Sequence, residues 1–224
     1  LGEFTIRDDQ YRLIYERIGH KVCPFCGIEY FDAPEAPRED LDHYLPRSRY
    51  PFASSNSKNL VPMGGRCNSA YKGTTDVLWN GAHRRTACYP YDHPGIAVTL
   101  ANSQPFGGWK DGAHPAWDVS FTPPSPESQS WDTVFNIRQR YVRDVLQPYY
   151  EPWLQRFADF CRAAGNVPAN PQELIDALNT YREFNAREGF SDRGFLKVAV
   201  FEVLVHHCRN GNQRLIDLLM DMFA

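Results

Sequence analysis

A pair of cysteines separated by two residues, Cys23 and Cys26, is the feature that most constrains how this chain folds. The intervening Pro24-Phe25 and the following Gly27 predict a tight turn that brings two sulfur atoms to one point. Six cysteines occur in 224 residues, and the other four are scattered: Cys67, Cys88, Cys161 and Cys208. Six cysteines in a secreted chain favour disulfides, but the first residues have neither the basic region nor the apolar run of an export signal. We therefore expect a cytoplasmic protein in which the pair binds a metal.

The composition is typical of a folded globular protein. Hydrophobic residues make up 42% of the chain, aromatic residues 14% and charged residues 23%. These fractions supply ample core material and exclude a wholly disordered chain. No stretch approaches the roughly 20 consecutive apolar residues of a membrane helix, so we expect no membrane partner.

Charge is distributed unevenly along the chain. The net charge of −3 argues against a protein that coats nucleic acid through bulk positive charge. A basic segment inside an acidic chain nevertheless favours phosphate binding, although solvated surfaces are also often basic. Between residues 43 and 93 the local charge is +5, from seven basic and two acidic residues: Arg47, Arg49, Lys58, Arg66, Lys72, Arg84 and Arg85 against Asp76 and Asp92.

Hydrophobic patterns predict an α+β fold with a mixed N-terminal part, residues 1–122, and a helical part, residues 130–224. Residues 123–128 are typical of a linker. In the first part we expect helices over 8–19 and 67–72, short strands over 41–45 and 59–62, and two half-buried strands, 96–100 and 117–121, paired across a long loop. In the second part we expect helices that start at Ser130, are interrupted at Pro148, and resume at Pro152, at Asn170-Pro171 and over 192–208 and 212–223.

Four polar residues stand at positions that a hairpin followed by a helix brings around one point. Asp42 and His43 lie at the end of the first strand, Asn59 opens the second, and Asn68 begins the helix. Carboxylate and amide oxygens are hard ligands that suit Mg²⁺, and a neutral histidine is a good general base near pH 7. A base for water together with a metal for a leaving oxygen is the chemistry of phosphodiester hydrolysis.

The ordered set of these motifs resembles the HNH endonuclease family, whose members have a ββα-metal core. The resemblance covers about residues 21–73, a third of the chain. It rests on Cys23-x-x-Cys26, Leu41-Asp42-His43-Tyr44-Leu45-Pro46-Arg47-Ser48, Asn59-Leu60-Val61-Pro62 and Cys67-Asn68-x-x-Tyr71-Lys72.

The resemblance implies a role for each matched residue. His43 is expected to activate water, and Asn59 to steady the loop and the backbone of His43. Asp42 and Asn68 are expected to hold one Mg²⁺, or Mn²⁺, because Asn68 stands where many members have a histidine and others an asparagine. Lys72 lies four residues after Asn68 on the same helix face. It is expected to contact a phosphate, with a solvated helix end as the alternative.

DNA is the implied partner, with Arg47, Arg49, Arg66 and Lys72 as candidate contacts. The strand Leu41–Pro46 is similar to that of small bacterial HNH proteins encoded beside ATPases in anti-phage systems, which implies a role in defence and an ATPase partner. Two rival hypotheses stay open: a restriction-type nuclease whose C-terminal helices read sequence, and a catalytically silent nucleic-acid or protein-binding module.

The sequence departs from the family at the zinc site that braces many members. The second cysteine pair is expected at residues 64 and 67, but residue 64 is glycine. Structural zinc takes four ligands, with cysteine and histidine preferred. Cys23, Cys26 and Cys67 supply three, and Cys88 is the leading candidate for the fourth. His83, His93 and a site without metal are the alternatives.

Overall fold

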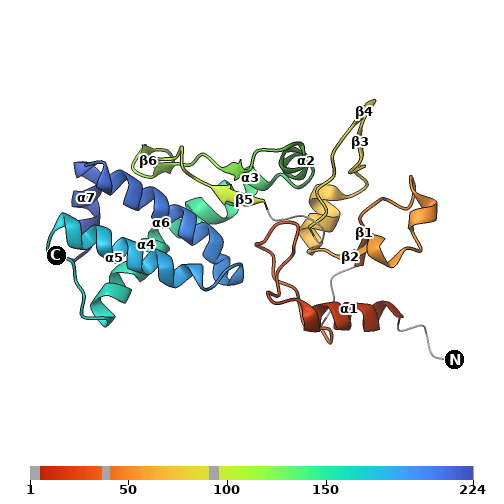
Figure 1. The fold of residues 1–224 in the computed structure, drawn as a ribbon, viewed down its shortest axis with the longest axis horizontal. Coiled ribbons are helices and arrows are strands. Elements are labelled where there is room, and N and C mark those ends of the chain that lie inside the picture. The colour runs from red at the N-terminus through yellow and green to blue at the C-terminus, as the bar shows by residue number, and fades with distance from the viewer. Residues whose placement is uncertain (1–5, 37–40, 91–95, 224) are drawn as a thin grey trace. The chain divides into compact units, whose positions relative to one another are not determined.

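The computed structural model describes residues 6–36, 41–90 and 96–223, and the chain divides into two compact units. Unit 1 comprises Leu1–Ile96 and Pro123–Ile137, and unit 2 comprises Ala97–Thr122 and Arg138–Ala224. The fold is mixed, with helices and small two-stranded sheets (Figure 1). It is therefore α+β, as the sequence predicts.

The boundary between the units differs from the division expected from the sequence. Residues 97–122 belong with the helices of unit 2, where His207 Nε2 lies 3.0 Å from the carbonyl oxygen of Ser103. Residues 123–137 belong with unit 1 instead of forming a linker and the start of the helical part. There the Trp131 indole donates a 2.6 Å hydrogen bond to the carbonyl oxygen of Phe25. Tertiary contacts of side chains such as these are not visible in the local pattern of residues.

Unit 1 is built from short elements in which β1 and β2 form one hairpin and β3 and β4 another. The register of the first pair is Leu41↔Pro62, Asp42↔Val61 and His43↔Leu60. A π-helical segment, η3, follows β2 after Gly64-Gly65, as expected. The bounds are α1 (Ile6–Arg17), β1 (Leu41–His43), η1 (Pro51–Ala53), η2 (Ser57–Asn59), β2 (Leu60–Pro62), η3 (Arg66–Lys72), β3 (Trp79–Asn80), β4 (His83–Arg84) and α2 (Pro126–Phe135).

An aromatic cluster forms the core of unit 1. The Phe25 ring, from the cysteine turn, stacks on Tyr44 with centroids 5.7 Å apart and packs against Phe135 of α2 at 5.1 Å. Tyr44 also meets the edge of Tyr89 at 5.3 Å. Burial of these rings joins the turn, the end of β1 and α2, because large aromatic side chains dominate the energetics of a small core.

Unit 2 combines small strands with packed helices. β5 pairs with β8 in the register Ala97↔Thr122, Val98↔Phe121 and Thr99↔Ser120, which confirms the expected pairing across a long loop. That loop contains a second hairpin, β6–β7, that the sequence pattern did not predict. The bounds are β5 (Ala97–Thr99), β6 (Gln104–Gly107), β7 (Pro115–Ala116), β8 (Ser120–Thr122), η4 (Tyr141–Leu146), α4 (Gln147–Ala163), α5 (Pro171–Ala186), η5 (Ser191–Arg193), α6 (Gly194–Arg209), α7 (Gln213–Met220) and η6 (Asp221–Phe223), with α3 (Ile137–Arg140) at the boundary of the units.

In unit 2, capping side chains mark the ends of helices better than prolines do. The Asn170 side chain accepts hydrogen bonds from the backbone of Gln172 and Glu173, which confirms the predicted start of α5. The break predicted at Pro148 and the restart predicted at Pro152 are both wrong, because η4 runs directly into α4, which has Pro148 in its first turn and Pro152 in its interior. η4 is π-helical, so its amides bond to carbonyls five residues earlier, and the pattern returns to that of an α-helix at the start of α4. The chain breaks instead at Asn136, whose φ of 51° is left-handed.

Ser125, rather than Ser130, caps the helix that follows the proline-rich segment. Its side chain accepts from the Ser128 backbone, and the Ser128 hydroxyl reaches back to the Ser125 backbone. This reciprocal pair is a capping box built from two serines. The last two helices are divided near Gly211, as expected, with a φ of 74° there.

In the part of the chain that the structure describes, no helix has both the length and the apolar character needed to cross a membrane.

The hydrogen bond between Trp131 and the cysteine turn provides a test of whether α2 belongs to the core of unit 1. Trp131→Phe removes the 2.6 Å hydrogen bond and leaves the Phe25 carbonyl without that donor. We expect it to lower the free energy of unfolding by about 1 kcal/mol or more, measured by urea unfolding followed by circular dichroism. Trp79→Phe is the matched control, because Trp79 is 44% exposed in the same unit. Equal losses in the two variants would contradict the assignment of α2 to this core.

Candidate functional site

The end of β1 presents Asp42 and His43 in consecutive positions. Antiparallel pairing with Val61 and Leu60 fixes their backbone, and both side chains are half-buried. His43 Nε2 lies 3.1 Å from the carbonyl oxygen of Ser54. A carbonyl oxygen only accepts hydrogen bonds, so in the neutral imidazole Nε2 carries the proton and Nδ1 is the acceptor.

Asn59 is buried and binds the backbone just beyond His43. Its Oδ1 accepts a 2.7 Å hydrogen bond from the Leu45 amide, and its Nδ2 donates to the Leu45 carbonyl at 3.2 Å. The Asn59 carbonyl also accepts from the Tyr44 amide at 2.9 Å. Three hydrogen bonds from one residue therefore hold the two residues that follow His43 in the chain.

Lys72 lies in a different environment from the one expected. Its side chain is 1% exposed, and Nζ lies 2.7 Å from Oδ2 of Asp42. The structure thus brings the last residue of η3 to β1, where the ammonium forms a buried ion pair. In this arrangement Lys72 is neither a solvated helix end nor a surface contact for a phosphate.

The Asp42 carboxylate has a mixed electrostatic environment. Burial raises its pKa, while the hydrogen-bonding and Coulombic attraction of Lys72 lowers it, and burial is the larger effect. Oδ2, the buried oxygen of this carboxylate, lies 2.7 Å from Nζ of Lys72. The ammonium therefore offsets part of the cost of burying the carboxylate at the end of β1.

Asn68 lies one turn before Lys72 in η3 and is half-buried. Residues four apart on a helix are neighbours on one face. Asn68 therefore lies on about the same face of η3 as Lys72. Its backbone is held by a 2.9 Å bond to the Gly64 carbonyl and by a 2.7 Å bond from Gly73.

The candidate arginines differ in their surroundings. Arg47 and Arg66 are exposed. Arg49 is also exposed, but one of its guanidinium nitrogens lies 3.5 Å from the buried Asp76 carboxylate. Arg47 and Arg66 are thus better placed than Arg49 to bind an external phosphate.

Asp76 has a structural role that the sequence does not predict. Tyr50 donates its hydroxyl to this carboxylate at 2.9 Å, and the Leu78 amide donates to it at 2.9 Å. The Arg85 guanidinium binds the Asp76 carbonyl at 3.2 Å. The one feature of the sequence that could have indicated this role is that Asp76 is one of only two acidic residues in the basic segment 43–93.

Cys23, Cys26 and Cys67 form a buried cluster. Their sulfur atoms all lie within 4.8 Å of one another, which is the spacing of three ligands around one metal ion. Burial raises the pKa of Cys23, and hydrogen bonding with Cys23 and Cys26 raises that of Cys67, so without a metal the Cys23 and Cys67 thiols stay protonated. Three close thiols could bind a metal such as zinc.

Cys88 does not belong to this cluster, which corrects the leading expectation for the fourth ligand. Burial raises the pKa of its thiol to about 11, and its carbonyl accepts a 2.6 Å hydrogen bond from the Tyr44 hydroxyl. His83 is exposed in β4 and is not in the cluster either. His93 lies outside the described residues.

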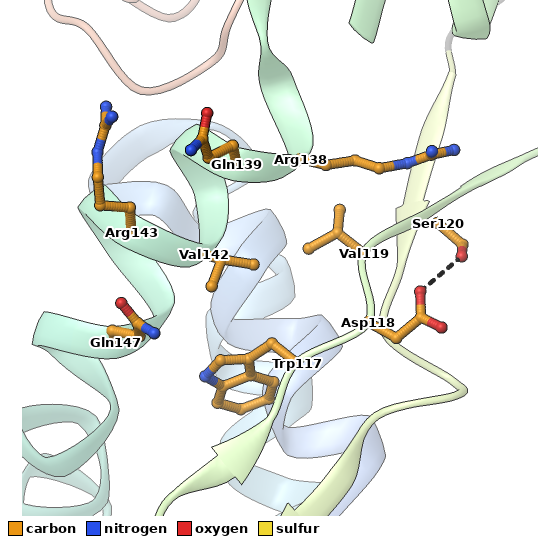
Figure 2. Close-up of a pocket in the computed structure, with 9 residues that line it drawn as sticks. All are labelled: Trp117, Asp118, Val119, Ser120, Arg138, Gln139, Val142, Arg143 and Gln147. Carbon is orange, nitrogen blue, oxygen red and sulfur yellow. Dashed lines mark hydrogen bonds between the residues drawn. The ribbon is translucent and has the colours of Figure 1, made fainter. Parts of the chain in front are cut away.

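A hollow on unit 2 is a second candidate site (Figure 2). It is lined by Trp117, Asp118, Val119, Ser120, Arg138, Gln139, Val142, Arg143 and Gln147. Figure 2 shows Arg138 and Arg143 extending in different directions. Arg138 stacks on the Phe121 ring at 4.8 Å, and Arg143 pairs with Asp144 at 2.5 Å. These guanidinium groups do not converge on a common ligand.

Comparisons of the chain with protein-family models, with curated proteins and with solved structures gave no match.

The Asp42–Lys72 pair predicts a stability loss with a defined pH dependence. Lys72→Met leaves the partly buried carboxylate without its cation and should cost about 3 kcal/mol at pH 7. The loss of the ammonium raises the pKa of Asp42 further. The penalty is therefore full where Asp42 is ionised and is relieved as the carboxyl takes up a proton at lower pH. Urea unfolding at pH 7 and pH 5 measures both effects.

Lys58→Met is the matched control for this experiment, since Lys58 is exposed. It should change the free energy of unfolding by about 0.5 kcal/mol or less. In addition, Asp42→Asn combined with Lys72→Met should cost less than the sum of the single changes. A loss in Lys72→Met that grows as the pH falls would exclude the proposed electrostatic cause.

Proposed function

We propose that this protein is a metal-dependent endonuclease of the HNH type that hydrolyses phosphodiester bonds in DNA. The observation that carries the proposal is the arrangement around the end of β1. Asp42 and His43 stand in consecutive positions there, Asn59 binds the backbone beyond them, and η3 packs Lys72 against Asp42. The order of these residues along the chain, with Asn68 four residues before Lys72, supports the proposal because it is the order of the family's motif.

His43 is the general base of this proposal. Because Nε2 donates to the Ser54 carbonyl, Nδ1 is the atom that accepts the proton of the attacking water. The Ser54 carbonyl fixes the imidazole orientation, and Asn59 fixes the backbone that follows it. A correctly oriented base reduces the entropy lost on reaching the transition state.

Asp42 and Asn68 are the residues that would hold Mg²⁺ or Mn²⁺. Their donor atoms are a carboxylate oxygen and an amide oxygen, hard ligands that fit such an ion. A divalent ion bound there stabilises negative charge on the phosphate and on the departing 3′ oxygen. The products are 5′ phosphate and 3′ hydroxyl ends.

Lys72 acts in this proposal through Asp42. The nearby ammonium opposes the effect of burial on the pKa of Asp42 and favours the ionised carboxylate. An ionised carboxylate has two oxygens and can bind Lys72 and a metal ion together. Arg47 and Arg66, both exposed, are the proposed contacts for the DNA backbone.

The same ion pair favours a second function. Lys72 already supplies a positive charge to Asp42, so the hairpin and helix are stable without a divalent ion. A catalytically silent nucleic-acid-binding module that kept this frame is therefore the alternative. The proposed defence role and ATPase partner rest on the resemblance of the strand Leu41–Pro46 alone.

Cleavage of plasmid DNA separates the two functions. The wild-type chain should cut supercoiled plasmid with Mg²⁺ and fail to cut it with EDTA. His43→Ala should lower the rate about 10²- to 10⁴-fold, as expected for loss of a general base. Gel electrophoresis measures the rate, and end-labelling should find 5′ phosphates.

His83→Ala serves as the matched control, because His83 is an exposed histidine of the same unit. It should cut at the wild-type rate. Cutting by His43→Ala at that rate would remove His43 from the mechanism. DNA binding without Mg²⁺-dependent cutting by the wild-type chain would favour the silent module.

A further inference from the structure

The carboxylate of Glu29 lies beside the buried cysteine cluster. Its Oε1 is 3.6 Å from the sulfur of Cys67 and 3.9 Å from that of Cys26. In a tetrahedral zinc site with three sulfur ligands and one oxygen ligand, each sulfur–oxygen edge is about 3.5 Å, given Zn–S and Zn–O bonds of about 2.3 and 2.0 Å. Two of the three edges expected for a carboxylate ligand are therefore already formed.

The backbone places Glu29 at this position. The Cys23 amide donates a 2.7 Å hydrogen bond to the Glu29 carbonyl, and the Gly27 amide donates to the Cys23 carbonyl at 2.7 Å. Gly27 has a φ of 66°, which closes the turn. The chain thus returns past the cluster two residues after the turn, at Glu29.

Glu29 is also held by the start of η3. Its second oxygen, Oε2, accepts a 3.1 Å hydrogen bond from the backbone amide of Arg66, the first residue of η3. Cys67 follows in the next position, so the carboxylate and this sulfur are positioned by the same turn of η3. With Oε2 bound to Arg66, Oε1 is the oxygen directed at the sulfur atoms.

Gly64 provides the room for this carboxylate. A Cβ atom at residue 64 would collide with Oε2 of Glu29 and would lie 3.0 Å from its Cβ and Cδ atoms. Any larger residue at position 64 would displace the Glu29 side chain. The glycine that stands where a cysteine ligand was expected is therefore what allows Glu29 to approach the cluster.

We propose that Cys23, Cys26, Cys67 and Glu29 form a zinc site with three thiolates and one carboxylate. Three thiolates select zinc over Mg²⁺ or Ca²⁺, and the carboxylate supplies the fourth ligand of a structural site. Oε1 has to approach Cys23 to complete the tetrahedron, through rotation of the Glu29 side chain. The site joins the cysteine turn to the start of η3 and does not depend on the proposed nuclease activity.

Metal analysis of the full chain tests this proposal directly. The wild-type chain should bind one Zn²⁺, and Glu29→Gln should weaken zinc binding about 100-fold or more in competition with a chromogenic chelator. Loss of a direct ligand should exceed the 10- to 100-fold effect of outer hydrogen-bonding partners. Glutamine can still accept from Arg66, so this variant separates ligation from the hydrogen bond. Glu16→Gln, at an exposed glutamate of α1, and Cys88→Ser should both bind zinc as the wild type does.

A paired substitution gives the converse test. Glu29→Ala should lose zinc affinity, and Glu29→Ala combined with Gly64→Cys should regain it, because removal of the carboxylate makes room for a fourth sulfur. With Co²⁺ in place of zinc, the regained site should show stronger sulfur-to-metal charge-transfer absorption than the wild type. Wild-type affinity and an unchanged Co²⁺ spectrum in Glu29→Gln would overturn the proposal, as would loss of zinc in Cys88→Ser or no zinc binding by the wild type.

Discussion

The buried contact between Lys72 and Asp42 is the interaction on which the candidate site depends. It joins the last residue of η3 to β1 across 30 positions in the sequence, and the lysine side chain is almost fully buried. A buried ammonium without a partner would cost several kcal/mol, so any packing of η3 that moved Lys72 away from Asp42 would be strongly disfavoured. The pair therefore fixes the end of η3 against β1.

The cysteine cluster constrains the opposite end of the same helix. Cys67 lies near the start of η3 and Lys72 at its end, so the cluster and the ion pair hold a seven-residue segment at both ends. Such a short helix has little stability of its own and needs tertiary contacts to form. The aromatic packing of Phe25 on Tyr44 connects the cysteine turn to the residue that follows His43. The cysteine cluster and the candidate functional site thus share neighbouring residues of one small unit.

Sequence patterns predicted the elements of this unit well where chemistry is local. The hairpin strands and the helix after Gly64-Gly65 follow from hydrophobic patterns and turn residues. The place of Cys67 beside Cys23 and Cys26 is what the family resemblance implies. The cap at Asn170 and the pairing of β5 with β8 follow from similar signals. The cap depends on a strong local preference of Asn170, and the strands of the pair are recognisable from the alternation of apolar residues in each.

Features that depend on distant side chains were not predictable in the same way. Lys72 is buried because η3 packs against β1, and no local sequence pattern predicts this packing. Cys88 was favoured as a ligand on residue type, but its backbone is bound to Tyr44, away from the cluster. The position of Glu29 beside the cluster is not predictable from the sequence, because a carboxylate is an uncommon partner for three cysteines.

The central claim is that Asp42 binds a divalent ion while it remains paired with Lys72. Electron paramagnetic resonance of Mn²⁺ added to the zinc-saturated chain measures this directly, because bound Mn²⁺ loses the sharp signal of the free ion. The account predicts one bound Mn²⁺ in the wild type and its loss in Asp42→Asn and in Asn68→Ala. Equal Mn²⁺ binding by Asp42→Asn and the wild type, or no binding by either, would contradict it.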